Sequence, residues 1–224
     1  MQQIALDIGI GANPTLTNYF AGPNGEALSH MQRLVQRPNT DSVPTYVWGA
    51  AGSGKTHLLR ASAAAMQSQG ASVGWLDASQ AEVPEFDESW SLLVMDDVHI
   101  YDAQRQHSAF GWFVQAASLQ RPVLCAGSST PVDLLLREDL RTRLGWGHVF
   151  GLQPLTEAQT RAALRQAADA RGLFLGDEVM DFTLRRFSRD LGTLFALLEE
   201  LDRYALQTQR AITIPLLKSM LENT

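Results

Sequence analysis

The sequence has one cysteine, Cys125, among its 224 residues, and no apolar run approaches the length of a membrane span. A disulfide framework and a cysteine-based metal site are therefore excluded. The N-terminus lacks the basic segment and apolar stretch of a secretory signal, and internal repeats are absent as well. We expect a cytoplasmic protein with no membrane partner.

An excess of positive charge is also missing. The chain carries 18 Lys and Arg against 24 Asp and Glu, a net charge of −6. This balance argues against a broad DNA-binding surface, so direct DNA binding is not supported. With 45% hydrophobic and 19% charged residues, the chain can bury the core of one large or two modest domains.

The sequence does contain a glycine-rich phosphate-loop motif at residues 49–56, which read Gly-Ala-Ala-Gly-Ser-Gly-Lys-Thr. Residues 44–48 before it are aromatic and β-branched and predict a buried strand. Residues 57–69 after it are rich in Ala, Leu and Gln and predict a helix. A strand, a glycine turn and a helix in this order are the context that a phosphate loop requires.

The residue types of this motif suit a nucleotide triphosphate. Glycines let the backbone amides approach the phosphates, and the start of the helix adds the positive end of its dipole. Lys55 is expected to reach the outer phosphates, and the Thr56 hydroxyl to ligate Mg²⁺. The residues expected to bind ADP or ATP here are Gly49, Gly52, Ser53, Gly54, Lys55, Thr56 and His57.

Strands and helices alternate through the first two thirds of the chain. Further strands are predicted at residues 72–77, 91–96, 121–126 and 148–152, with helices at 25–36, 104–119 and 137–144. This alternation predicts a parallel five-stranded α/β sheet flanked by helices. From residue 156 onward the pattern is helical only, at about 157–171, 177–188, 191–207 and 215–221. A domain boundary is therefore expected near residues 153–154.

Two adjacent carboxylates follow the third predicted strand, where residues 92–97 read Leu-Leu-Val-Met-Asp-Asp. A strand that ends in acid one βαβ unit after a phosphate loop often supplies the metal partner. Asp96 is expected to hold Mg²⁺ through water, and Asp97 to polarise the attacking water. Many related ATPases have Glu at the second position, and the shorter Asp97 predicts slow hydrolysis or none.

Residues 140–147, Leu-Arg-Thr-Arg-Leu-Gly-Trp-Gly, resemble the Ser-Arg-Phe-Gly-Trp-Gly box of the bacterial replication initiator DnaA, an AAA+ protein. In that family the arginine of the box is the arginine finger that reaches a neighbouring subunit's nucleotide, which gives this role to Arg143. Residues 188–194 resemble the sensor 2 region, where Arg189 matches the arginine that contacts bound nucleotide. Ser128 occupies the sensor 1 place, although relatives often carry Asp there.

Near the N-terminus, residues 3–8 read Gln-Ile-Ala-Leu-Asp-Ile and resemble the peptide that binds the DNA polymerase III sliding clamp (beta subunit). An extended peptide of this kind would place Leu6 and Ile8 in an apolar groove, with Gln3 bonding at its rim. The same residue pattern also occurs by chance in edge strands and disordered ends.

This sequence resembles the AAA+ core of the initiator without the initiator's DNA-binding domain, which is the pattern of the Hda family. The resemblance covers residues 15–221. It implies residues 1–14 as a flexible clamp-binding segment, 15–153 as the nucleotide-binding α/β domain and 154–224 as a small all-helical lid. It also implies a regulator, with ADP as the expected ligand, that stimulates ATP hydrolysis by DnaA through the arginine finger. Such a protein negatively regulates replication initiation and is expected to have weak or no ATPase activity of its own. It is also expected to form a homodimer or oligomer and to associate with the nucleoid through the clamp.

Two alternatives remain at this point. A helicase-loader-like or other small AAA+ ATPase acting through its own hydrolysis would share the phosphate loop, Asp96 and an arginine finger. A small P-loop kinase would share the phosphate loop, but the helical C-terminal part offers no evident acceptor site.

Overall fold

The computed structural model describes residues 14–37, 43–187 and 191–222. The chain forms two compact units that divide after Pro154. We call residues 14–154 the core unit and the residues from Leu155 onward the C-terminal unit. The expected clamp-binding residues Gln3, Leu6 and Ile8, and also Arg189, lie outside the described residues.

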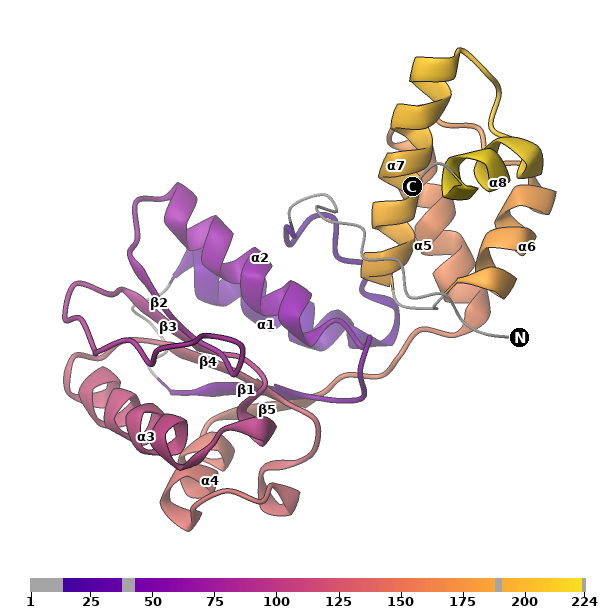
Figure 1. The fold of residues 1–224 in the computed structure, drawn as a ribbon. Coiled ribbons are helices and arrows are strands. Elements are labelled where there is room, and N and C mark those ends of the chain that lie inside the picture. Colours follow the sequence, from indigo (N-terminus) through magenta and orange to yellow (C-terminus); the bar gives the residue numbers. More distant parts are fainter. Residues whose placement is uncertain (1–13, 38–42, 188–190, 223–224) are drawn as a thin grey trace. The chain divides into compact units, whose positions relative to one another are not determined.

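The core unit is built on a five-stranded parallel sheet in the order β2-β3-β4-β1-β5 (Figure 1). β1 lies between β4 and β5, with Tyr46 opposite Cys125 on one side and Val149 on the other. The central strands β3 and β4 are buried along their whole length, which explains their uninterrupted apolar sequences. The strands are β1 (Thr45–Trp48), β2 (Val73–Leu76), β3 (Leu92–Met95), β4 (Val123–Gly127) and β5 (His148–Gly151).

Helices cover both faces of the sheet (Figure 1). α1 (Gly25–Gln36) and α2 (Lys55–Ser68) pack on one face, where Met31 and Leu58 join Val47 and Leu124 in one buried cluster. α3 (Ala103–Ser118) and α4 (Glu138–Gly145) pack on the other, in a cluster centred on Tyr46 and Trp112. Three 3-10 turns complete this unit: η1 (Gly22–Asn24), η2 (Val98–Ile100) and η3 (Pro131–Asp133).

The C-terminal unit consists of helices around a leucine-rich core of its own. α5 begins with a capping box, in which Thr156 accepts from the Gln159 backbone while the Gln159 side chain accepts from Thr156. The described helices are α5 (Glu157–Asp169), α6 (Asp177–Arg186), α7 (Leu191–Thr208) and α8 (Ile214–Glu222).

The structure confirms the predicted fold class, a five-stranded parallel sheet flanked by helices. Most expected strands are shorter by one or two residues at their ends, because hydrogen bonding between strands stops where the chain turns away. The 3-10 turns were not predicted, since three residues are too few to show a periodicity. Within the described residues, no helix combines the length and the apolar character needed to cross a bilayer.

Candidate functional site

The phosphate loop connects β1 to α2 and curls around the side chain of its own lysine. Gly54 lies directly before the helix with a φ of +94°, a conformation that favours glycine. A Cβ on Gly49 would lie 2.5 Å from the Leu152 carbonyl oxygen and 2.9 Å from Ser53 Oγ. The loop is therefore a close-packed backbone cradle in which a side chain at Gly49 has no room.

Lys55 is buried inside this cradle. Its Nζ donates to the carbonyl oxygens of Gly49, at 2.8 Å, and Ala50, at 3.0 Å. Burial lowers the pKa of Lys55, and the nearby charges of Asp97 and Asp96 act in the opposite direction. The ammonium therefore bonds to its own loop and is placed to exchange these carbonyls for phosphate oxygens.

The Ser53 hydroxyl gives an independent indication of what the loop can hold. Its Oγ is buried and has no hydrogen-bond partner among the described residues. Such an atom inside a folded protein calls for a ligand or water. An anion with several acceptor oxygens fits a loop that combines this hydroxyl, glycine amides, Lys55 and the N-terminus of α2.

Thr56 and Asp96 meet on the metal side of the site. The Asp96 carboxylate follows β3, is 4% exposed and accepts a hydrogen bond from the Thr56 side chain. Burial raises the pKa of Asp96, and the Thr56 hydrogen bond opposes that rise. A hydroxyl beside a buried carboxylate is the oxygen set that Mg²⁺ uses when it keeps several waters. No group of three or more His, Cys, Asp or Glu side chains gathers elsewhere in the described parts of the chain to suggest a different metal site.

Asp97 adopts a left-handed backbone conformation with a φ of +50°, uncommon for a residue other than glycine. Its backbone N–H donates to Asp96 Oδ1 at 3.0 Å. Its own carboxylate is about half exposed and lies 3.9 Å from His99 Nδ1. The two carboxylates thus differ in burial: Asp96 is buried beside Thr56, whereas Asp97 is about half exposed and lies near enough to Lys55 for its charge to act on that ammonium.

Ser128 is exposed and follows the end of β4, next to the phosphate loop. The Gly49 N–H donates to the Gly127 carbonyl at 3.3 Å, which joins the two segments. The fully buried Tyr46 hydroxyl donates to the Ser129 carbonyl at 2.7 Å. Tyr46 thus holds the segment that contains Ser128, a role that its buried strand sequence did not reveal.

Residues before α1 cover the other side of the loop. A Cβ on Gly54 would lie 2.9 Å from Tyr19 Cε2, and the Tyr19 ring centroid is 5.4 Å from that of His57. His57 Nε2 donates to the Thr15 carbonyl at 3.1 Å. Burial lowers the pKa of His57, which keeps the ring neutral near pH 7. Tyr19 therefore contacts the phosphate loop directly.

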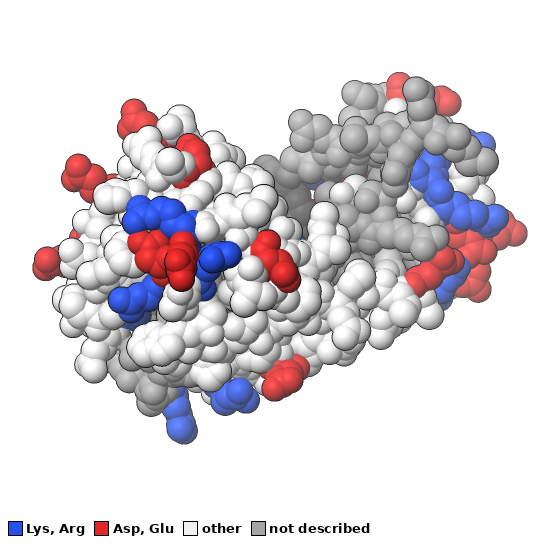
Figure 2. Space-filling model, turned by 90° about the horizontal axis from the view of Figure 1, so that it is seen from below, with Lys and Arg blue, Asp and Glu red and all other residues white. Residues whose placement is uncertain are grey.

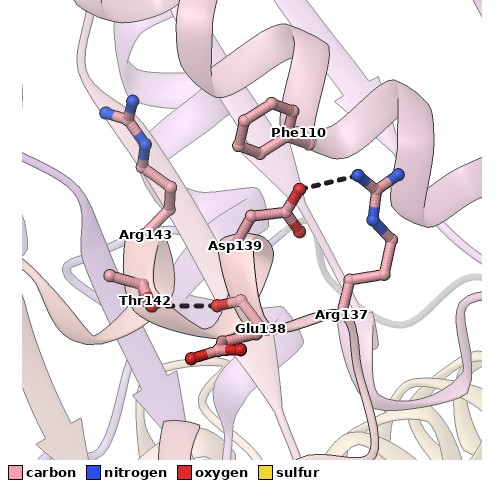
Figure 3. A pocket seen from close by; sticks show the side chains of 6 residues that line it. All are labelled: Phe110, Arg137, Glu138, Asp139, Thr142 and Arg143. Atoms are coloured by element: carbon pink, nitrogen blue, oxygen red, sulfur yellow. Dashed lines mark hydrogen bonds and ion pairs between the residues drawn. The ribbon is translucent and has the colours of Figure 1, made fainter.

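Arg143 lies apart from the phosphate loop, on α4. It lines an open hollow of about 690 Å³ together with Phe110 of α3 and other residues of the α4 region (Figure 3). Arg137 pairs with Asp139 at 2.6 Å, and its guanidinium lies 5.7 Å from the centre of the Phe110 ring. The Arg143 guanidinium points away from this pair and has no hydrogen bond or ion pair among the described residues. None of the residues lining the hollow belongs to the phosphate loop.

The arginines of α5 and of the turn that follows it are engaged within the C-terminal unit. Arg161 pairs with Asp181, Arg165 with Asp177 at 2.6 Å, and Arg171 with Glu199 at 3.0 Å. On the face in Figure 2, basic and acidic side chains lie close together rather than in a stripe of one sign. These arginines therefore connect helices.

A parallel sheet in the order β2-β3-β4-β1-β5 with a phosphate loop after β1, in a chain with an additional helical unit, is the arrangement of the AAA+ fold among P-loop proteins. Residues 157–221 match the family model described as "Hda, lid domain". This match covers most of the C-terminal unit, and the chain as a whole has an AAA+ fold.

Solved structures agree with this fold. Domain III of the replication initiation protein DnaA from Thermotoga maritima is 20% identical, with a TM-score of 0.76 over 96% of this chain and 98% of that chain. AMPPCP-bound DnaA from Aquifex aeolicus is 20% identical, with a TM-score of 0.72 over 89% of this chain and 68% of that chain. A point mutant of RuvB from Thermotoga maritima is 15% identical, with a TM-score of 0.64 over 95% and 73%.

Proposed function

We propose that this protein is a nucleotide-gated regulator of the replication initiator DnaA, and that Arg143 acts in trans on the ATP of DnaA. The observation that carries the proposal is the position of Arg143: its half-buried side chain lines an open hollow away from the chain's own phosphate loop and has no ion pair or side-chain hydrogen bond among the described residues. A guanidinium that is always charged and offers a planar fork suits a phosphate of another subunit.

The chain's own nucleotide site supports the part of the proposal in which bound nucleotide controls the regulator. The solved DnaA from Aquifex aeolicus is bound to AMPPCP, an adenine nucleotide analogue. In this chain Lys55, the glycine amides and Ser53 would hold ADP or ATP, and Thr56 with Asp96 would hold Mg²⁺ through its waters. Ser128 would bond to a phosphate or water, and Arg189 is proposed as a further contact. Mg²⁺ supplies charge neutralisation between the phosphates when it is bound.

Asp97 gives a reason to expect weak hydrolysis by the chain itself. Aspartate is one methylene shorter than the Glu of many related ATPases, and the Asp97 side chain is about half exposed, whereas Asp96 is buried. A shorter and solvated carboxylate polarises a water at the phosphate less effectively than a longer one. The bound nucleotide, ADP, would then fix the shape of the protein while the partner's ATP is hydrolysed.

The sliding clamp is the second proposed partner, through Gln3, Leu6 and Ile8. Clamp binding would bring the protein to DNA without a DNA-binding surface of its own and would associate it with the nucleoid. The expected homodimer or oligomer is a further part of this proposal, because AAA+ proteins commonly assemble through the surface that holds the arginine finger.

The arginine-finger role can be tested by substitution on α4. Arg143→Ala should lower the stimulated ATPase rate of DnaA by about 10³-fold or more, the range known for arginine fingers, while ADP binding to the variant is retained. Arg141→Ala, two positions away on the same helix, is the matched control and should retain most of the stimulation. Normal stimulation by the Arg143→Ala protein would exclude the proposed mechanism.

The clamp and the ATPase alternative are tested together. Deletion of residues 1–8 should abolish binding to the sliding clamp in a surface plasmon resonance assay and leave ADP affinity unchanged. Unchanged clamp affinity would remove Gln3, Leu6 and Ile8 from the site. Strong intrinsic hydrolysis together with helicase binding would favour the helicase-loader-like alternative.

A further inference from the structure

A buried asparagine, Asn24, connects Tyr19, which lies on the phosphate loop, to residues 152–153, where the chain leaves the core unit. Asn24 is 5% exposed and occupies the N-cap position of α1, yet its side chain makes no capping hydrogen bond. Asparagine at this position normally accepts from the first turn of its helix. Here the amide is directed elsewhere in the unit.

The side-chain amide of Asn24 makes two hydrogen bonds to the backbone of Gln153. Its Nδ2 donates to the Gln153 carbonyl at 2.9 Å, and its Oδ1 accepts from the Gln153 N–H at 2.8 Å. The two residues are 129 positions apart in the sequence. Because this pair satisfies both backbone groups of Gln153, the segment after β5 is held in one place relative to the start of α1.

The same amide also reaches the nucleotide side. The Asn24 side chain hydrogen-bonds to Tyr19, whose ring lies against Gly54 and His57. Tyr19 therefore touches the phosphate loop with its ring and Asn24 with its polar end. A displacement of Tyr19 would therefore act on a side chain whose amide nitrogen and oxygen are both hydrogen-bonded to Gln153.

The segment after β5 has a second link to the phosphate loop. The Leu152 N–H donates to the Trp48 carbonyl at 2.7 Å, and the Leu152 carbonyl is the atom closest to where a Gly49 side chain would begin. Pro154 follows Gln153, and the C-terminal unit begins at Leu155. Residues 152–153 are thus the last point at which the core unit holds the chain before that unit begins.

We propose that Asn24 is a positioning residue that transmits occupancy of the nucleotide site, through Tyr19 and residues 152–153, to the orientation of the C-terminal unit. This inference rests on the proposed nucleotide binding. Nucleotide against the phosphate loop moves or fixes Tyr19, Asn24 carries that change to Gln153, and the direction in which the chain leaves the core unit changes with it.

The test measures a distance between the two units in the full chain. Spin labels are attached at Ala117→Cys on α3 and Gln207→Cys on α7, both exposed positions, and Cys125 is too buried to react. Double electron–electron resonance is recorded with and without saturating ADP and Mg²⁺. The labelled parent should show a shift in the distance distribution when ADP is added.

Three substitutions in the labelled chain distinguish a loss of transmission through Asn24 from a loss of folding. Asn24→Ala should bind fluorescent ADP nearly as well as the parent and lose the ADP-dependent shift. Gln153→Ala is the control, since its backbone groups remain and the shift should persist. Tyr19→Phe removes one hydroxyl, leaves the Gln153 bonds in place and should reduce the shift, so it tests the proposal even if Asn24→Ala does not fold.

Each outcome is decisive. A full shift in Asn24→Ala or in Tyr19→Phe would overturn the inference, as would a parent that binds ADP without any shift. A parent that does not bind ADP in the fluorescence assay would overturn both the inference and the proposed nucleotide site. Loss of the shift in Asn24→Ala, reduction in Tyr19→Phe and retention in Gln153→Ala would support it.

Discussion

Single residues at the phosphate loop depend on neighbours that are distant in the sequence. Lys55 is held by carbonyls of its own loop, but the loop is held by Gly127 of β4 and by Leu152 after β5. Tyr19, whose ring lies against Gly54 of the loop, precedes the first helix. The geometry of the site is therefore a property of at least four chain segments, although its chemistry is concentrated in one.

His57 should make the stability of the core unit depend on pH. Its folded pKa is lowered by burial, so the unfolded chain binds more protons, and the free energy of unfolding falls as the pH drops below about 6.5. His57→Gln can still donate to the Thr15 carbonyl but does not titrate. Between about pH 7.5 and about pH 5.5 the parent should lose more stability in urea unfolding than the variant does. Equal losses in the two proteins would contradict this prediction.

The two glycines of the Gly-Trp-Gly box should respond differently to substitution. A Cβ on Gly147 would lie 1.9 Å from the Pro44 carbonyl oxygen, whereas a Cβ on Gly145 would lie 3.5 Å from Pro131 Cβ, an ordinary contact. Gly147→Ala should destabilise the protein by about 1–3 kcal/mol, as overpacking against backbone does. Gly145→Ala should be near neutral. Chemical denaturation of both variants measures the difference in the free energy of unfolding. Equal stabilities would show that the backbone near Pro44 shifts to accommodate the added methyl group.

At the scale of elements, the C-terminal unit is held by its leucine core and by ion pairs of arginines in α5 and just after it. The pairs differ in exposure: the side chains of Arg171 and Glu199 are 25% and 23% exposed, and those of Arg165 and Asp177 are 44% and 82% exposed. Arg171 also donates to the Ala167 carbonyl at 3.0 Å. The less exposed pair, with its additional hydrogen bond, contributes more because solvent screens it less.

Arg171→Ala should therefore lower the stability of the C-terminal unit by about 1 kcal/mol, and Arg165→Ala by only a few tenths. Far-UV circular dichroism during urea unfolding reports the helices of this unit together with those of the core unit. Equal effects of the two substitutions would show that exposure does not govern these pairs.

At the scale of the whole molecule, the two units have separate hydrophobic cores. The core-unit clusters involve residues up to Leu152, and the C-terminal cluster is built from residues such as Leu164, Leu197 and Leu217. All five tryptophans, at positions 48, 75, 90, 112 and 146, belong to the core unit. Tryptophan fluorescence therefore observes that unit alone, while circular dichroism observes both.

The two probes should give transitions that do not coincide, because separate cores unfold separately. Arg171→Ala should move the part of the dichroism transition that belongs to the C-terminal helices and leave the tryptophan transition in place. A single superimposable transition that shifts as a whole in this variant would show that the units unfold together.

Much of the fold could be predicted because its signals are local. The apolar run of residues 92–95, the glycine turn at 49–54 and the alternation of strands and helices each fit within a short window, and the parallel sheet followed from them. The nucleotide-binding residues were named by the same local pattern, and their roles stay predictions. The ion pairs of Arg161, Arg165 and Arg171 were not predicted, because the spacing of arginines along one segment does not show which acidic side chains face them.

The sequence by itself determined the class of sheet, the place of the phosphate loop and the chemistry available there, since these depend on residue types at short spacing. Only the tertiary structure decided that Asn24 bonds to Gln153 instead of capping its helix, that Tyr46 holds the segment containing Ser128, and that Arg143 has no partner in its own chain among the described residues. These contacts join segments far apart in the sequence. They depend on how the strands are ordered in the sheet, and no local pattern of residues contains that order.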